Sequence, residues 1–338
     1  MSYVPSSSMN LKNAKSLSKK SFFEYRDKAI DLMVETLQEN GAPIDIAREF
    51  KECLDYNTQD GKFLRGLSTV EIFVLITNEL NSAVLERACL IGWIVEIMHA
   101  LFLILDDIMD KSALRRGQPC WYKLEHVGLR AINDGFLMKS CILALVQKLT
   151  RGTSGIKFCE FLVSVFLRTS IGQAMDMKYC YLGSQITKIW LNTKPQYIHS
   201  FYLYMLAVSW LAFNSILEQM GLIFQIQDDY LDVYGDSEVT GKIGTDIQEG
   251  KCTWLSVEAL KVTNELDHEI MKNNYGKLDE KCVHRVRDIF RKYHIKDRCI
   301  AHLKALARNV EDQLKSMPPS LLISYYEEYI HNHVHRVK

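Results

Sequence analysis

Proline is scarce in this chain of 338 residues, which contains six prolines. Because proline breaks helices, the three long stretches without it, residues 44–118, 120–194 and 196–317, leave room for several helices in each. Alternating strand patterns bounded by Asn-Gly or Asp-Gly turns are missing, and so is any repeat at the period of a solenoid. These absences exclude an all-β protein and a repeat array, and they favour an all-α fold.

The chain also lacks net charge and any recognisable arrangement of cysteines. Lys and Arg together number 41, as do Asp and Glu, so no overall field attracts nucleic acid or an anionic membrane. The nine cysteines are odd in number and include no C-x-x-C pair, which excludes a disulfide framework and a structural zinc site. We therefore expect a reducing compartment, the cytoplasm, and no nucleic-acid partner.

The N-terminal residues 1–23 contain four lysines, many serines and no acidic residue. This composition is similar to that of a mitochondrial transit peptide, but it lacks arginine and a clear apolar face. We predict a flexible arm over residues 1–23, followed by a single domain over residues 24–338. The mitochondrion is the alternative location.

No charged residue occurs between Lys194 and Glu218, so residues 195–217 form a run long enough to span a membrane. Serines and an asparagine interrupt this run. A helix buried on all sides in a large bundle has the same composition, so we predict a buried helix and no membrane span. Helical spacing of apolar residues is also found upstream, at Ile91, Ile94, Val95, Met98, Leu101 and Phe102.

An acidic cluster follows the apolar residues 100–105. Asp106 and Asp110 are four residues apart and Asp107 and Asp110 three apart, so on a helix the three carboxylates share one face. Such close anions repel one another unless the helix end is solvated or cations bridge them, and Mg²⁺ prefers oxygen ligands and usually keeps a substrate phosphate. Taken alone, the cluster indicates a solvated helix end.

The same D-D-x-x-D pattern recurs at Asp228, Asp229 and Asp232, after the mostly apolar residues 220–227. Two such clusters, each following an apolar stretch, are hard to explain as surface residues. If they face each other across a helical bundle, they form a carboxylate-lined opening above an apolar shaft. The pair therefore predicts a magnesium site that binds a diphosphate with a hydrocarbon tail.

Basic residues lie near both clusters in the sequence, where a diphosphate ligand requires them. Arginine presents a fork that matches phosphate, and lysine presents a mobile point charge, so the set is suited to clamp one or two diphosphates. The candidates around the first cluster are Lys62 and Arg65 with Gly61, and Arg115 and Arg116. Those after the second cluster are Lys242 and Lys251, which flank Gly244, Thr245 and Asp246.

These motifs resemble the trans-isoprenyl diphosphate synthases, and specifically the farnesyl diphosphate synthases of animals. The resemblance extends from about Tyr56 to Trp254 and, more loosely, to the C-terminus. It rests on the first aspartate cluster and on five further motifs, which are Tyr-Asn-x-x-x-Gly-Lys-x-x-Arg-Gly-Leu from Tyr56, Arg-Arg-Gly-Gln-x-Cys-Trp-Tyr from Arg115, Gly172-Gln173 with Asp176, Phe-Gln-Ile-Gln-Asp-Asp-Tyr-Leu-Asp from Phe224, and Val-Thr-Gly-Lys-Ile-Gly-Thr-Asp-Ile-Gln from Val239 with Lys251-Cys-x-Trp. It implies the isoprenoid synthase helical bundle with a central apolar cavity, usually as a homodimer.

The resemblance implies a head-to-tail condensation of isopentenyl diphosphate with an allylic diphosphate, dimethylallyl or geranyl, to give geranyl or farnesyl diphosphate. It implies three Mg²⁺ ions held by Asp106, Asp110 and Asp228 with their neighbours Asp107, Asp229 and Asp232. It assigns stabilisation of the leaving diphosphate to Arg115, Lys242 and Lys251. Isopentenyl diphosphate would bind Gly61, Lys62, Arg65, His99 and Arg116, and Gln173 is a further substrate-binding candidate.

Three residues of the helix before Asp106 also acquire roles from the resemblance. A lone histidine on an apolar helix is more often a core residue, but His99 lies two turns before Asp106, where the family has Gln or His in contact with isopentenyl diphosphate. Leu101 and Phe102 occupy the positions that floor the hydrocarbon pocket, where bulk limits the growing chain. Animal farnesyl synthases commonly carry an aromatic residue at the position of Leu101, so product length stays open.

The chain departs from the family in segments that handle substrate. The family places Lys-Thr on a helix upstream of Ser-Phe-Tyr-Leu, whereas Pro195 stands there in this chain and Lys194 lies one residue too early. Divergence of this kind also fits a terpene synthase, as in insects, which ionises geranyl or farnesyl diphosphate to a mono- or sesquiterpene.

The set Lys62, Arg65, His99 and Arg116 favours condensation, because a terpene synthase does not need an isopentenyl diphosphate site. A third hypothesis is a catalytically weak subunit that tunes an active partner. The six intact aspartates argue against it.

Overall fold

Helices account for nearly all of the regular secondary structure. The computed structural model describes residues 10–77, 80–150, 153–179, 214–235 and 244–334. Within these ranges, one two-stranded hairpin and one 3-10 turn are the exceptions to α-helix and loop. The predicted all-α fold is therefore confirmed.

The helices divide into two compact units. The first comprises the described residues up to Ser164 together with Ser320–Tyr325, and the second comprises those from Val165 to Pro319 and from Tyr326 onward. The helices α7 (Thr153–Tyr179) and α16 (Leu321–Val334) contribute residues to both units. The single domain predicted over residues 24–338 stays a prediction.

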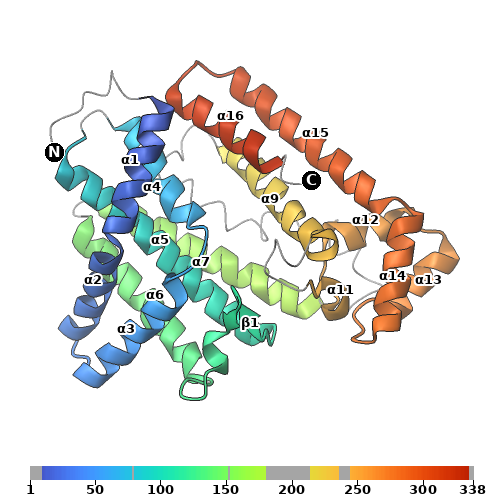
Figure 1. The fold of residues 1–338 in the computed structure, drawn as a ribbon, viewed down its shortest axis with the longest axis horizontal. Helices are drawn as coiled ribbons and strands as arrows, with labels where there is room; N and C mark the ends of the chain where they lie inside the picture. The colour runs from blue at the N-terminus through green and yellow to red at the C-terminus, as the bar shows by residue number, and fades with distance from the viewer. Residues whose placement is uncertain (1–9, 78–79, 151–152, 180–213, 236–243, 335–338) are drawn as a thin grey trace. The chain divides into compact units, whose positions relative to one another are not determined.

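The first unit is built around one long helix, α5 (Ser82–Met109) (Figure 1). The helices that pack against it are α1 (Leu11–Glu24), α2 (Arg26–Glu39), α3 (Ile44–Thr58), α4 (Leu64–Ile76) and α6 (Arg130–Leu149). By length and composition alone, α5 could cross a membrane, but 78% of its most apolar segment is buried inside the protein. Burial of this kind is typical of a core helix.

Part of the arm predicted to be flexible is a packed helix. The ring of Phe22 in α1 stacks on Trp93 of α5 with their centroids 4.5 Å apart, and Trp93 Nε1 donates to the backbone oxygen of Phe22 at 2.7 Å. Ala14, Ser18 and Ser21 are buried along the same face of α1. The flexible-arm prediction is therefore wrong for residues 11–23. The sequence did not signal this helix, because its buried face contains mostly small side chains besides Phe22 rather than a continuous apolar stripe. Residues 1–9 lie outside the described part of the chain.

A short hairpin follows the first aspartate cluster. The strand β1 (Leu114–Arg115) pairs antiparallel with β2 (Gln118–Pro119), and the 3-10 turn η2 (Trp121–Lys123) follows. The turn residues Arg116 and Gly117 have φ values of 54° and 77°. Positive φ at both turn positions matches the twist of a two-residue hairpin, but it is uncommon for arginine. The sequence analysis, which looked for Asn-Gly or Asp-Gly turns, therefore did not predict this hairpin.

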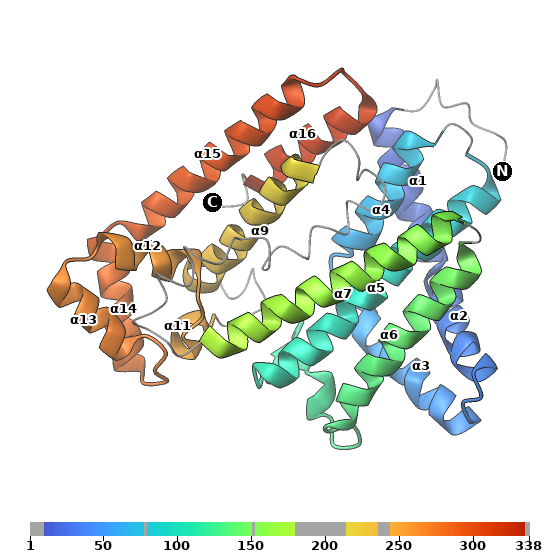
Figure 2. The same cartoon turned by 180° about the vertical axis from the view of Figure 1, so that it is seen from behind.

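The second unit is built from the later helices (Figure 2). They are α9 (Asn214–Tyr234), α11 (Asp246–Glu249), α12 (Trp254–Val262), α13 (Glu265–Asn274), α14 (Glu280–Lys292) and α15 (Ile295–Lys315). The helix α15 packs along α9 and also contacts α12 and α14. Of the uncharged run, residues 195–213 lie outside the described residues, so the buried helix predicted there stays a prediction.

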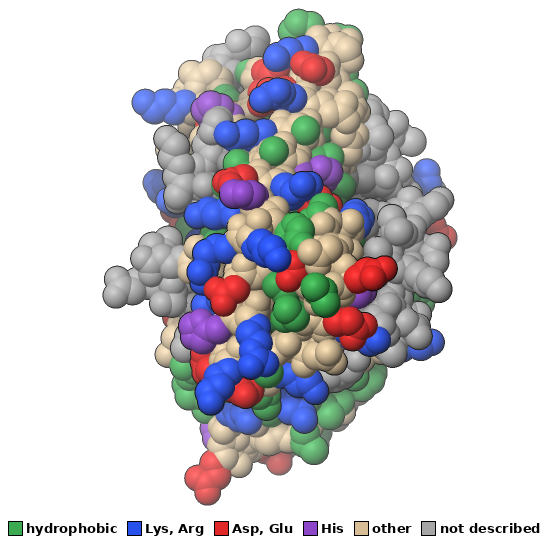
Figure 3. All heavy atoms as spheres, turned by 90° about the vertical axis from the view of Figure 1, so that its right-hand side faces the viewer, with side chains coloured by type: hydrophobic (Ala, Val, Ile, Leu, Met, Phe, Trp, Pro, Cys, Tyr) green, Lys and Arg blue, Asp and Glu red, His purple; other side chains and the backbone are tan. Residues whose placement is uncertain are grey.

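The helix α14 is strongly amphipathic. It buries Val283, Val286, Ile289 and Phe290 on one face. Figure 3 shows the face of the molecule that carries α13, α14 and α15, where Lys and Arg side chains intermingle with Asp and Glu. Charges of both signs are therefore present on this face, as the balanced composition of the chain leads one to expect.

Candidate active site

The first aspartate cluster lies at the C-terminal end of α5. Asp106 and Asp107 belong to its last turn, and Asp110 is the C-cap residue, whose N–H donates to the Asp106 carbonyl at 2.8 Å. The side chain of Asp106 is 35% exposed, whereas that of Asp107 is 4% exposed. The structure therefore separates two accessible carboxylates, one helical turn apart, from a third that points inward.

Asp107 is held by Arg115 of the hairpin. The guanidinium Nε and Nη2 donate to Asp107 Oδ1 at 3.0 and 2.5 Å, and Nη2 lies 3.4 Å from Asp106 Oδ2. Burial lowers the pKa of Arg115, but the two carboxylates more than offset this and raise it. Arg115 is therefore a permanent cation at the edge of the cluster, and part of its charge is directed at Asp107.

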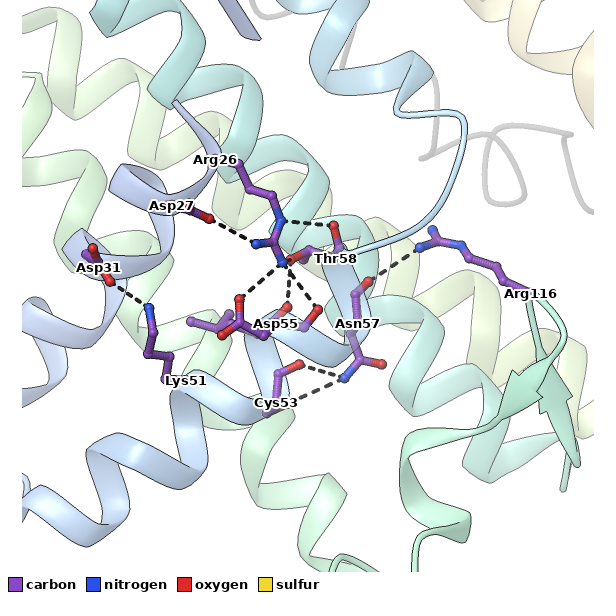
Figure 4. A network of polar contacts seen from close by, with 10 residues as sticks. Arg26, Asp27, Asp31, Lys51, Cys53, Asp55, Asn57, Thr58 and Arg116 are labelled. Atoms are coloured by element: carbon purple, nitrogen blue, oxygen red, sulfur yellow. Dashed lines mark hydrogen bonds and ion pairs between the residues drawn. The ribbon is translucent and has the colours of Figure 1, made fainter. Parts of the chain in front are cut away.

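Arg116 lies against the loop that joins α3 to α4. Its Nη1 donates to the backbone oxygen of Asp60 in a short hydrogen bond, and to that of Asn57 at 3.5 Å (Figure 4). Gly61 has a φ of 138°, and a Cβ placed on it would lie 2.9 Å from Arg116 Cζ. A side chain at residue 61 would displace the guanidinium. Because Gly61 has none, Arg116 can lie against it, and the structure thus brings these two predicted ligands together.

The end of α3, which leads into this loop, is tied to α2 by Arg26, a residue that the sequence analysis missed. Arg26 Nη2 donates to Asp55 Oδ1 and to Thr58 Oγ1, both at 3.1 Å (Figure 4). Its Nε also donates to the Thr58 carbonyl at 3.4 Å. These bonds fix the last turn of α3, which ends three residues before Gly61. No sequence pattern signals such a role, because Arg26 lies 32 residues from Thr58.

The hairpin makes further bonds to the end of α3. Tyr56 Oη donates to the Pro119 carbonyl at 2.7 Å, and Gln118 Nε2 donates to Asp60 Oδ2 at 3.2 Å. A cavity within the first unit lies at this junction, and its lining includes Tyr56, Asp107, Arg115, Arg116, Gln118 and Trp121. Tyr56, Gln118 and Trp121 were not among the predicted site residues, although all three lie within the motifs that carry the resemblance.

Arg65, at the start of α4, and His99, on α5, are close enough to interact electrostatically. Lys62 is exposed just before α4, and Arg65 is half-buried in its first turn. His99 is 12% exposed, and burial together with the positive charge of Arg65 lowers its pKa to about 3. The imidazole is therefore neutral at physiological pH, so it can offer hydrogen bonds to a ligand but no positive charge.

Leu101 and Phe102 lie on α5 between His99 and Asp106. Leu101 is 2% exposed and belongs to the core of the first unit, and Phe102 is half-buried. The two adjacent side chains point in different directions around the helix. Phe102 is thus the more accessible of the two to a ligand.

The second aspartate cluster lies in the last two turns of α9. Asp228 is exposed, whereas Asp229 is 7% exposed and accepts the Trp254 N–H at 2.7 Å and Gln225 Nε2 at 3.0 Å. Burial raises the pKa of Asp229 to about 7. Asp232 accepts the N–H of Asp246 at 3.0 Å. Only Asp228 of the three therefore presents its carboxylate mainly to solvent.

Lys251 lies in the turn that links α11 to α12. Its side chain is 15% exposed, with Nζ 3.9 Å from Glu249 Oε2, and its carbonyl accepts Tyr275 Oη at 2.7 Å. The turn is therefore held from both sides, by Tyr275 and by the bond between Asp229 and Trp254. Lys242, the other lysine predicted after the second cluster, lies outside the described residues.

Gln173 lies in α7, within the second unit. Its Nε2 is buried and has no hydrogen-bond partner among the residues that the structure describes. A buried amide donor of this kind is costly unless another group pairs with it. This placement suits a ligand-binding side chain.

The donors in these clusters fit a magnesium ion. No group of three or more His, Cys, Asp or Glu side chains is gathered closely enough to hold a metal within the described part of the chain. Mg²⁺ does not require such a group, since it is commonly bound by one or two carboxylates together with substrate phosphates. Asp106, Asp110 and Asp228 offer hard oxygen donors of this type. That the two clusters face each other stays a prediction.

Comparisons with known proteins agree with the motifs. The sequence profile of the polyprenyl synthetase family matches residues 47–293. The human farnesyl pyrophosphate synthase is 35% identical over 306 residues, which cover 82% of this chain and 72% of that protein. The rat enzyme of the same name is 34% identical, with 90% of this chain and 93% of that protein covered.

Solved structures give the same result. The farnesyl diphosphate synthase of T. brucei, in complex with a bisphosphonate, superposes with a TM-score of 0.83 at 26% sequence identity. The match covers 95% of this chain and 100% of that one. The predicted resemblance and the isoprenoid synthase fold are thereby confirmed, and the chain belongs to the polyprenyl synthetase family.

Proposed function

We propose that this chain joins isopentenyl diphosphate to an allylic diphosphate, dimethylallyl or geranyl, to give geranyl or farnesyl diphosphate. The observation that carries the proposal is that residues predicted to bind isopentenyl diphosphate lie close together in pairs within the first unit. Gly61 lies against Arg116, and Arg65 interacts electrostatically with His99. The names of the human, rat and T. brucei relatives support farnesyl diphosphate as the product.

The chemistry follows from the charges that develop. The bond between the allylic carbon and the diphosphate oxygen breaks, and the double bond of isopentenyl diphosphate attacks the cation to form a carbon–carbon bond. The released diphosphate then takes the proton that the product loses. Bound Mg²⁺ would supply positive charge to the leaving diphosphate, with Asp106, Asp110 and Asp228 as its protein ligands. Arg115, Lys242 and Lys251 would add fixed positive charge.

The terpene synthase alternative is not favoured. A lyase that ionises one allylic diphosphate has no use for a second diphosphate site. The relatives described above are named farnesyl pyrophosphate synthase, which is a prenyltransferase and not a lyase. The deciding experiment incubates the protein and Mg²⁺ with geranyl diphosphate, with and without isopentenyl diphosphate. We expect an elongated diphosphate only when isopentenyl diphosphate is present. Volatile hydrocarbons in its absence would identify a lyase instead.

Product length is expected to depend on Phe102, because bulk at the pocket floor stops chain growth by overlap. Replacing Phe102 with alanine should shift the main product toward longer diphosphates, as measured by chromatography of the dephosphorylated products. Leu105→Ala is the matched control, because Leu105 lies on the same helix but packs toward Gly135 of α6, so it should leave the product distribution unchanged. An unchanged product distribution in Phe102→Ala would remove this residue from the pocket floor.

We also propose that the chain forms a homodimer. Apolar side chains are exposed on one face of α6 and one face of α7, with fractions from 37% to 70%. They are Leu129, Ile132 and Phe136 at α6, and Ile156, Val163, Leu167 and Ile171 on α7. Their spacing of three, four and seven residues places each set on one side of its helix. Exposed apolar faces of this kind support association.

Phe136→Asp should therefore weaken the dimer by at least about tenfold, since a charge would be buried in an apolar contact. Light scattering coupled to gel filtration measures the mass at several concentrations. Leu278→Asp is the control, because Leu278 is 85% exposed at a loop of the second unit. A Phe136→Asp protein with the dimeric mass of the wild type would contradict the assignment of this face.

The reducing cytoplasm is the location that we propose. All the cysteines that the structure describes are free thiols, and several of them are buried. Free buried thiols are typical of proteins that are not exposed to an oxidising compartment.

A further inference from the structure

Glu96 is a buried carboxylate to which neither the motifs nor the proposed reaction assigns a role. It is the one charged residue between Ala88 and Leu105, and it is 5% exposed. A charge in such an apolar helix is costly unless hydrogen bonds and opposite charges compensate it. The contacts of Glu96 therefore indicate what it stabilises.

One carboxylate oxygen caps the neighbouring helix. Glu96 Oε1 accepts the N–H of Gly66 at 2.8 Å, and Gly66 is the third residue of α4. The first N–H groups of a helix have no partner within it and are usually satisfied by the N-cap side chain. Here the N-cap residue is Phe63, which makes no such bond and has a φ of 48°. Glu96 takes over this function from α5, where its negative charge also favours the N-terminal end of the α4 dipole.

The bond depends on a close approach of the two helices. A Cβ on Gly66 would lie 2.5 Å from the Gly92 carbonyl oxygen and 2.7 Å from Glu96 Cγ. A Cβ on Gly92 would lie 2.8 Å from the Gly66 carbonyl oxygen. Two glycines at the crossing thus let the carboxylate reach the backbone of α4.

The other carboxylate oxygen lies next to the predicted substrate ligands. Glu96 Oε2 is 3.8 Å from His99 Nδ1, one turn along α5. Burial would raise the pKa of Glu96, but His99, the Gly66 N–H and the positive charge of Arg65 together lower it. The carboxylate is therefore ionised, and it places a fixed negative charge beside His99 that also interacts with the positive charge of Arg65.

We propose that Glu96 is a positioning residue for isopentenyl diphosphate. By capping α4 and contacting His99, it sets the relative placement of Arg65, at the start of α4, and His99, on α5, before the substrate binds. Lys62 directly precedes the N-cap residue of the capped helix. The inference rests on the proposed function, because it concerns the second diphosphate of that reaction.

The test separates the two substrates. Steady-state kinetics with Mg²⁺, geranyl diphosphate and isopentenyl diphosphate give the KM of each for the wild type, Glu96→Ala and Glu96→Gln. We expect Glu96→Ala to raise the KM for isopentenyl diphosphate at least tenfold, about 1.4 kcal/mol, with the KM for geranyl diphosphate within about twofold. Glu96→Gln keeps an oxygen that accepts the Gly66 N–H but loses the charge, so an increase of about threefold is expected.

Asn264→Ala is the matched control, since Asn264 caps α13 through the Asp267 N–H at 2.9 Å. It should lower the melting temperature without changing either KM. If Glu96→Ala does not fold, Glu96→Gln decides the question. A folded Glu96 variant with an unchanged KM for isopentenyl diphosphate, or with both KM values raised in parallel, would overturn the inference. A wild type that elongates neither dimethylallyl nor geranyl diphosphate would instead overturn the proposed function.

Discussion

Replacing Asp106 with alanine is expected to lower kcat by at least about a hundredfold, because stabilisation of the leaving group is lost. The stability of the protein should change little, since the side chain of Asp106 is 35% exposed and its ion pair with Arg115 is long, at 3.4 Å. The measurement is the rate of condensation, together with the melting temperature by circular dichroism.

The adjacent Asp107 provides the matched control. Asp107→Ala leaves the guanidinium of Arg115 without the carboxylate that holds it, so it should destabilise the fold by about 2 to 3 kcal/mol. The two neighbouring aspartates are thus expected to differ, one acting mainly on turnover and the other mainly on stability. Equal losses of stability in both variants, or turnover within a few-fold of wild type in Asp106→Ala, would contradict this division.

The second cluster is expected to show the same division. Asp228→Ala should also reduce kcat by at least about a hundredfold while leaving the melting temperature nearly unchanged, because Asp228 is exposed. Asp229→Ala should destabilise the protein by about 1 to 3 kcal/mol, since it leaves the Trp254 N–H without its acceptor at the start of α12.

Asp229→Asn is the control for that variant. Its amide oxygen can still accept the Trp254 N–H, so much of the stability should return. A melting temperature of Asp229→Ala equal to that of the wild type would show that this bond does not hold the turn that carries Lys251.

The helical class of the fold was predictable because helix-breaking residues are scarce and apolar residues recur at helical spacing. The helix α1 was not, because three of the four side chains that it buries are small and two of them are serines. A pattern that scores only large apolar residues does not register such a face. The hairpin was not predicted for a related reason. Its turn places Arg116 at positive φ, a position where Asn or Gly is the usual residue.

The residue types of the site were also predictable, but their individual roles were not. Asp106 and Asp107 are chemically identical in the sequence, and only the position of Arg115 distinguishes the accessible carboxylate from the buried one. The role of Glu96 depends on its bond to a backbone N–H 30 residues away in the sequence. That N–H is within reach because α4 and α5 cross closely at two glycines, Gly66 and Gly92. Contacts of this kind arise from tertiary packing and leave no local pattern.

The proposal that this family member condenses two diphosphates is tested most directly by isotope incorporation. The wild-type protein is incubated with Mg²⁺, unlabelled geranyl diphosphate and ¹³C-labelled isopentenyl diphosphate, and the products are analysed by mass spectrometry. We predict farnesyl diphosphate that carries the labelled isoprene unit, with its formation stopped by EDTA and restored by added Mg²⁺. Unlabelled hydrocarbons formed at the same rate with or without isopentenyl diphosphate would contradict the account.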